Sequence, residues 1–78
     1  MADRVLIVNA IWDHDAKVWV AESDDVPGLI TEADTVEALI GKLDVLVPEL
    51  LEENDGIDAP EVPVTVMWQT MQRVRLHR

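Results

Sequence analysis

The chain has 78 residues, of which 16 are acidic and six are basic, so its net charge at neutral pH is −10. It contains no cysteine, which excludes disulfides and thiolate zinc sites, and no run of about 18 apolar residues that could span a bilayer. This length and composition predict a single α+β domain over residues 1–78, and the lack of a signal-peptide pattern predicts a cytoplasmic protein.

The charges are distributed unevenly along the chain. All 16 acidic residues lie at or before Glu61, together with three of the six basic residues, so residues 1–61 carry −13. The charges of residues 62–78 are those of Arg73, Arg75 and Arg78. An acidic body repels nucleic-acid phosphates and acidic membranes and attracts basic partners, although it can also serve solubility alone. The basic end predicts a charge-complementary contact, within the fold or with a second copy.

The first half of the chain predicts three strands. Residues 4–13 and 17–23 are rich in β-branched and apolar residues and are separated by a short polar turn, so they predict a hairpin. Residues 24–28 predict a second turn, because Pro27 fixes its φ angle and Gly28 tolerates a positive one. Residues 29–33 predict a short third strand.

A helix is predicted next. Asp34 and Glu37 have the spacing of a capping box, and apolar residues then recur at helical intervals. Pro48 cannot donate a hydrogen bond to the carbonyl of Asp44 and disfavours helical geometry at the residue before it. We therefore expect a kink or break at Pro48, followed by a second short helix to about Asn54. The apolar positions are Val36, Leu39, Ile40, Leu43, Leu46 or Val47, Leu50 and Leu51.

The remaining residues predict a loop over 55–60 and one long strand over 61–76, whose start Pro63 places at a sheet edge. A right-handed crossover through the helix makes this strand parallel to the first. Placing the two side by side predicts a two-layer β-β-β-α-β fold. Its mixed four-stranded sheet has the order 3-2-1-4, and the proline-interrupted helix covers one face.

The alternation of side chains along the first two strands predicts what each sheet face carries. If Trp12 lies opposite Trp19, the helix covers Leu6, Val8, Ala10, Trp12, Trp19 and Ala21, and Asn9 and Glu22 mark the opposite face. That face then exposes Val5, Ile7, Ile11, Val18 and Val20. Such a patch is unusual for a monomer, so we expect a homodimer whose interface includes this patch and, on the last strand, Arg73 and Arg75. The alternative is a face reserved for another partner.

An ordered set of motifs occupies residues 18–39. The stretch Val-Trp-Val-Ala-Glu-Ser-Asp-Asp-Val-Pro-Gly-Leu (18–29) is followed by Thr-Glu-Ala-Asp-Thr-Val-Glu-Ala-Leu (31–39). This succession of hairpin strand, Asp-x-Pro-Gly turn, short strand and Asp-Thr-x-Glu-Ala-Leu helix start resembles the HicB-like antitoxin family. The motifs are recognisable over about residues 18–54. The resemblance implies a degenerate RNase H-like fold and binding to a small basic mRNA-cleaving toxin, whose active surface such antitoxins cover.

The resemblance also bears on the binding site and on DNA. An acidic surface that binds a basic toxin should include Asp24, Asp25, Glu32 and Asp34, although the same turn and cap have a purely structural interpretation. Many of these antitoxins carry a C-terminal DNA-binding domain, and no helices for one follow residues 72–76 here. We therefore expect the short, single-domain branch of the family, without autonomous DNA binding.

Catalysis, metal binding and cofactor binding are not expected. RNase H-type hydrolysis requires several carboxylates around two metal ions, and the first strand has Asn9 where one carboxylate is needed. His14 and His77 have no ligand pattern around them, and the glycines form no phosphate-binding loop. The alternative to an antitoxin is an orphan self-associating or RNA-associated domain. Its phosphate contacts would be Arg73, Arg75 and Arg78.

Overall fold

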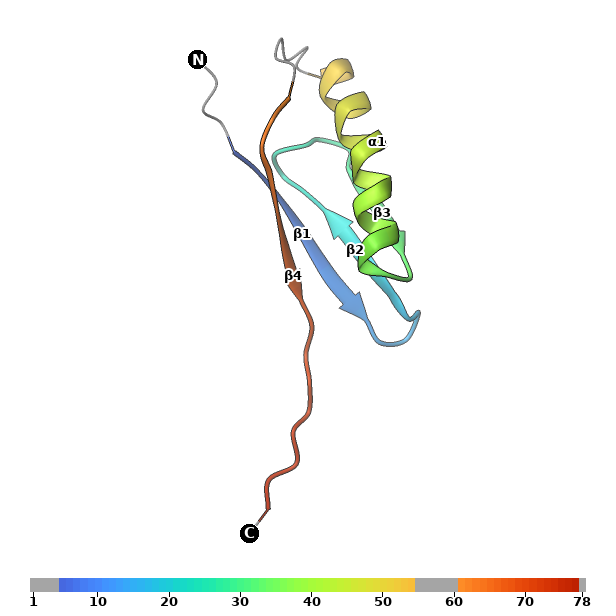
Figure 1. Cartoon of the computed structure of the whole chain (residues 1–78), viewed down its shortest axis with the longest axis vertical. Coiled ribbons are helices and arrows are strands. Elements are labelled where there is room, and N and C mark those ends of the chain that lie inside the picture. The colour runs from blue at the N-terminus through green and yellow to red at the C-terminus, as the bar shows by residue number, and fades with distance from the viewer. Residues whose placement is uncertain (1–4, 55–60, 78) are drawn as a thin grey trace.

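The computed structural model describes residues 5–54 and 61–77, which form one four-stranded sheet and one helix (Figure 1). The elements are β1 (Leu6–Asp13), β2 (Val18–Glu22), β3 (Ile30–Ala33), α1 (Val36–Asn54) and β4 (Val64–Gln69). The strand order is β3-β2-β1-β4, with β1 antiparallel to β2 and parallel to β4. The predicted α+β fold, strand order and parallel last strand are confirmed. The loop predicted over residues 55–60 lies outside the described residues.

The first hairpin has the predicted register, in which Trp12 lies opposite Trp19. Its turn is closed by Asp13, whose Oδ1 accepts hydrogen bonds from the backbone N–H groups of Asp15 at 2.9 Å and Ala16 at 3.0 Å. Lys17 completes the turn with a φ of 61°. Because a shift of one residue would exchange the two sides of a strand, this register decides which side chains meet the helix.

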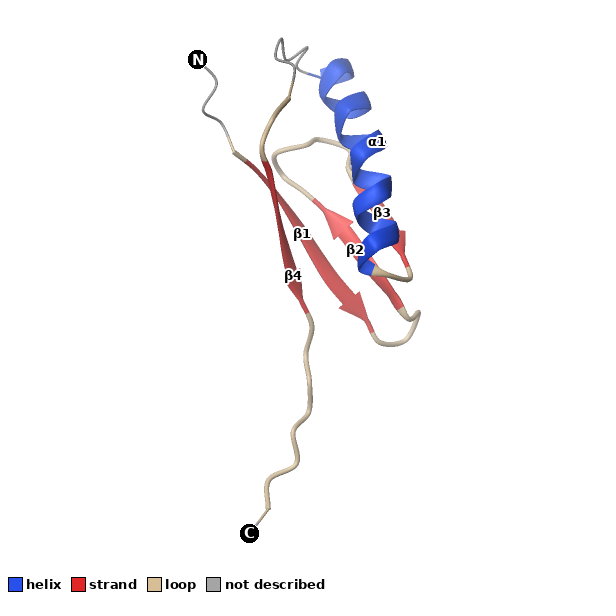
Figure 2. Cartoon of the chain, in the orientation of Figure 1, coloured by secondary structure: helices blue, strands red, loops and turns tan. Residues whose placement is uncertain are grey.

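The core lies between α1 and one face of the sheet (Figure 2). Leu6, Val8, Ala10 and Ala21 are fully buried on that face, as predicted. Trp12 differs: it lies on the same side but packs edge-on against Trp19, with ring centroids 5.4 Å apart, outside the buried cluster. Each large buried side chain stabilises the fold by about 1.5–3 kcal/mol. The helix contributes Leu39, Leu43, Val47 and Leu51, and the connections and β3 contribute Val26, Leu29 and Ala33.

Of the kink or break predicted at Pro48, the break and the second short helix after it are wrong, because α1 runs as one helix to Asn54 with Pro48 inside it. A proline inside a helix costs about 3 kcal/mol. Val47 and Leu51 are buried on either side of it, so packing of the helix against the sheet offsets that cost. Pro48 and Asp44 are both exposed, so the carbonyl that loses its donor lies on the solvent side of the helix.

The predicted cap at Asp34 is also wrong, by one residue. The side chain of Thr35 accepts the backbone hydrogen bond of Ala38 at 3.0 Å, so Thr35 is the N-cap. Glu37 lies in the first turn, where a negative charge favours the helix dipole, but it does not close a capping box. At the other end, Asn54 Nδ2 donates to the carbonyl oxygens of Leu50 and Pro27, which ties the helix to the second turn.

The last strand is much shorter than predicted. It ends at Gln69, because the strand beside it, β1, enters its turn after Asp13 and the parallel pairing stops at Ile11 and Gln69. Residues 70–77, which we call the arm, continue away from the sheet as an extended and exposed segment (Figure 1). They give the protein its length of 57 Å, against 24 and 19 Å in the other two directions.

Candidate functional site

One face of the sheet carries no helix, and we call it the helix-free face (Figure 2). Its side chains alternate with those of the core, and several apolar ones are exposed. The exposed fraction is 47% for Ile11 and 76% for Ile30. Val18 and Val20 are half-buried. Val5, just before β1, continues the alternation of this face. The strand registers place the following residues on it: Ile7, Asn9, Ile11, Val18, Val20, Glu22, Ile30, Glu32, Thr65, Met67 and Gln69. The five apolar residues that the sequence assigned to this face therefore lie together.

The helix-free face combines these apolar side chains with acidic ones. Glu22 lies opposite Ile30, and Glu32 lies opposite Val20, so both carboxylates stand on β2 and β3 among apolar neighbours. Both are exposed. Arg73 and Arg75 lie on the arm, whereas Lys42 reaches from the helix to the edge of β3, where its Nζ donates to the backbone carbonyl oxygen of Glu32. The surface is suited to a partner that offers apolar and positively charged groups.

The four acidic residues proposed for partner binding do not form one cluster. Asp24 and Asp25 follow the end of β2, whereas Asp34 follows the end of β3. These two strands are antiparallel, with Trp19 opposite Ala33, so Asp34 lies at the other end of the sheet from Asp24. Glu32 lies within β3 on the helix-free face. The sequence motif therefore contributes two separate acidic positions at the margins of the face rather than a single site.

Asp25 has a structural role that its sequence position did not reveal. The backbone pairing of β1 with β2 ends at Asn9 and Glu22, and side chains take over beyond it. Asp25 Oδ2 accepts a hydrogen bond from Ile7 N at 2.7 Å, and the Ser23 hydroxyl donates to Ile7 O. Ser23 Oγ also accepts from the backbone of Asp25 at 3.0 Å. The turn thus replaces the missing strand contacts of β1, and Asp24 is the exposed acid of the pair.

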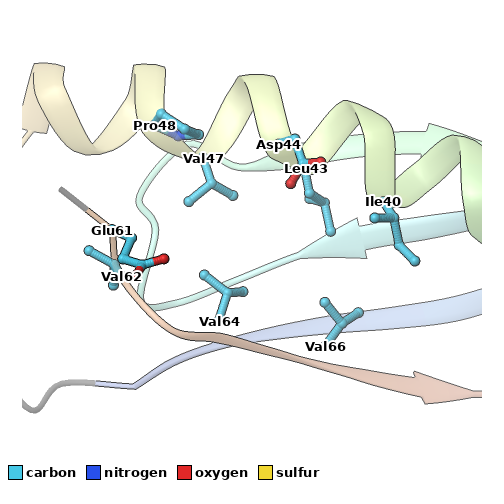
Figure 3. A pocket seen from close by; sticks show the side chains of 9 residues that line it. All are labelled: Ile40, Leu43, Asp44, Val47, Pro48, Glu61, Val62, Val64 and Val66. Atoms are coloured by element: carbon cyan, nitrogen blue, oxygen red, sulfur yellow. The ribbon is translucent and has the colours of Figure 1, made fainter.

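A groove lies between α1 and β4 (Figure 3). It forms because α1 packs against β2 and β3, where Ala21 and Ala33 allow close approach, and leaves β4 uncovered. Its volume is about 470 Å³. Sequence reasoning missed it by assigning the helix to the whole face. Its lining is mostly apolar with two acids at the margin: Ile40, Leu43, Asp44, Val47, Pro48, Glu61, Val62, Val64 and Val66.

The arm carries the two arginines that the sequence assigned to an interface. Arg73 and Arg75 alternate with apolar residues that are largely exposed, Val74 at 69% and Leu76 at 80%. At its start, the carbonyl oxygen of Met71 lies 3.1 Å from His14 Nε2, within hydrogen-bonding distance. The start of the arm therefore lies beside the hairpin turn, and its residues are exposed to their end at His77.

Within residues 5–54 and 61–77, no group of three His, Asp or Glu side chains could hold a metal ion. Across these same ranges, α1 is neither long nor apolar enough to cross a membrane.

The architecture defines a small two-layer α+β domain with one uncovered sheet face and an extended arm. The chain belongs to the family described as a domain of unknown function, DUF1902, whose model matches residues 5–77. It is 55% identical to the hypothetical protein TTHA1013 from the extremely thermophilic bacterium Thermus thermophilus, whose crystal structure superposes with a TM-score of 0.70. That match covers 94% of this chain and 100% of the other. Curated proteins give no significant match. The family match extends to residue 77, so it includes the arm.

Proposed function

We propose that this protein is a non-catalytic protein-binding domain of the HicB-like kind, an antitoxin that binds a small basic toxin RNase in the cytoplasm. The observation that carries the proposal is the helix-free face, where exposed apolar side chains surround Glu22 and Glu32. The motif resemblance over residues 18–54 supports the class of partner. The family match to DUF1902 over residues 5–77 is compatible with this function.

The face offers both of the contributions that such a complex needs. Burial of Ile7, Ile11 and Ile30 against a partner would supply affinity, since buried apolar area is the main favourable term in association. Glu22 and Glu32 would pair with basic groups of the toxin and fix its orientation. The strongly negative body would also speed the encounter with a positively charged protein.

The positions of the acidic residues support a non-catalytic role. A nuclease of the RNase H type needs carboxylates that converge on two metal ions. Here Asp24 and Asp34 lie at opposite ends of the sheet, and Asn9 occupies the centre of β1. Purified protein with magnesium or manganese is therefore expected to leave RNA, DNA and hybrid substrates uncut. Metal-dependent cleavage lost in Asp24→Asn or Glu32→Gln would contradict this part of the proposal.

Binding is tested with the product of a small basic open reading frame adjacent to this gene, or with proteins captured from the native host. Ile11→Lys places a positive charge in the apolar part of the helix-free face and should weaken a complex at least tenfold. Val45→Lys is the matched control, because Val45 is similarly exposed, 57% against 47% for Ile11, but lies on the helix. A complex that tolerates Ile11→Lys as well as it tolerates Val45→Lys would show that another surface binds.

The electrostatic part has its own test. Reversing both Glu22 and Glu32 to lysine should slow association more than it speeds dissociation, and the difference should shrink at high salt, because exposed charges act mainly on encounter. Identical association rates for the wild type and the variant at every salt concentration would remove steering from the account. Binding of RNA in place of a protein, lost with Arg73→Gln and Arg75→Gln, would instead favour the RNA-associated alternative.

A further inference from the structure

Within residues 5–54 and 61–77, two features at one edge of the sheet lack a neighbouring strand. β4 is an edge strand, and within the described residues it pairs only with β1. The arm continues directly from β4 and is exposed along its whole length (Figure 1). An unpaired strand edge and an unpaired extended segment of the same chain are each able to accept a further strand.

The side chains of the arm have the alternation that would suit the groove. Along β4, Val64 and Val66 point toward α1 and line the groove (Figure 3). Successive residues of a strand point to opposite faces, so residues 74 and 76 continue on the groove side and residues 73 and 75 on the helix-free side. The groove side of the arm therefore carries Val74 and Leu76, and the other side carries both arginines.

We propose that two copies of this chain pair through β4 and the arm, with the arm of each copy forming a fifth, antiparallel strand beside β4 of the other. In this arrangement a twofold axis passes at Thr70, which lies opposite Thr70 of the second copy. Val74 of one copy then lies beside Val66 of the other, and Leu76 lies beside Val64. The same operation provides partners for both unpaired features, as a closed twofold contact does.

Three properties favour this occupant of the groove over an unrelated peptide. The eight residues of the arm are enough to cover the six residues of β4. The apolar residues of the arm fall beside the apolar lining of the groove, because even-numbered residues face α1 in both copies. The arm carries Arg73 and Arg75 and no acid, so it adds no like charge to the strongly negative body of the second copy.

This inference is independent of the proposed binding of a basic toxin. With the axis perpendicular to the sheet, both helices lie on one side of the joined sheet, and both helix-free faces remain open on the other. A dimer that binds no toxin and a toxin-binding monomer are therefore separate outcomes, each of which overturns one proposal and leaves the other standing.

Sedimentation equilibrium of the full chain tests the pairing. The wild type should have the mass of two chains, twice 8.8 kDa, at tens of micromolar. Val74→Pro removes a backbone donor and blocks strand pairing at a residue outside the sheet and the helix, so it should give one-chain mass with an unchanged far-UV circular dichroism spectrum. Arg75→Gln, one residue away but on the other side of the arm, should keep the two-chain mass. A wild-type mass of one chain that is unchanged on tenfold concentration, or a two-chain mass for Val74→Pro, would overturn the proposal.

Disulfide trapping tests the arrangement itself, since the natural chain contains no cysteine. Full-length Val66→Cys and Val74→Cys, prepared separately and mixed, should form an intermolecular disulfide under mild oxidation. Thr65→Cys is the control, because Thr65 neighbours Val66 but points to the helix-free face. Equal cross-linking of Val74→Cys to Thr65→Cys and to Val66→Cys would exclude the proposed pairing even if the protein were dimeric.

Discussion

The two faces of the sheet are built from the same strands and differ in what covers them. On the helix side of β1, Leu6, Val8 and Ala10 are completely buried, whereas Ile7 and Ile11, from the alternate positions, are exposed. Both sets are similarly apolar. The difference shows that folding of one protomer uses only half of the apolar side chains of this strand, so the other half is available for binding.

The largest expected change in stability comes from a substitution on the buried side of the sheet. Leu39 is fully buried in α1, and Leu39→Ala should lower the free energy of unfolding by about 3 kcal/mol, because it removes apolar contacts and leaves a cavity. Ile11→Thr, on the helix-free face, keeps a β-branched side chain and should change stability by less than about 0.5 kcal/mol. Urea unfolding followed by tryptophan fluorescence, at one fixed protein concentration, measures both. Equal destabilisation would mean that the helix-free face is part of the core.

The fold was predictable where local pattern and topology agree. Alternation along residues 4–13 and 17–23, the turn at Gly28 and the crossover rule were enough for the strand order and the hairpin register. The prediction of a helix break at Pro48 was wrong because the energetic cost of proline in a helix is local. The burial of Val47 and Leu51, which offsets that cost, arises only when the helix packs on the sheet. The predicted length of β4 was wrong because a strand requires a neighbouring strand, and the pairing with β1 ends before the arm begins.

A second test compares side chain and backbone on the helix-free face. Ile7 is held there through its backbone, which bonds to Ser23 and Asp25. Ser23→Ala removes the hydroxyl that donates to Ile7 O and accepts from the backbone of Asp25, and should cost about 1–2 kcal/mol. Asp24→Ala, at the exposed neighbour, should leave the melting temperature unchanged. If the two variants have the same melting temperature, the turn does not stabilise β1.

The candidate site could be predicted only in part. The alternation of residues along a strand placed Val5, Ile7 and Ile11 on one surface, because successive side chains of any strand point to opposite faces. The acidic set was assembled from sequence proximity, and proximity in a chain that reverses direction puts Asp24 and Asp34 at opposite ends of the sheet. The groove was not predictable, because it depends on where α1 rests across the strands, which the packing of Ala21 and Ala33 decides.

The smallest effect concerns the start of the helix that makes the two faces different. Thr35 Oγ1 accepts the hydrogen bond of Ala38 N at 3.0 Å, and Leu39, the next residue, begins the buried stripe. Thr35→Ala should therefore cost about 1 kcal/mol, the usual loss for an N-cap. Asp34→Ala should cost less than half as much, because that carboxylate contributes only a screened interaction with the helix dipole, about 0.3 kcal/mol. Thermal unfolding at low and high salt separates the two: the Thr35 loss should persist in salt and the Asp34 loss should fade. A larger loss for Asp34→Ala would return the cap to Asp34 and would start the helix one residue earlier.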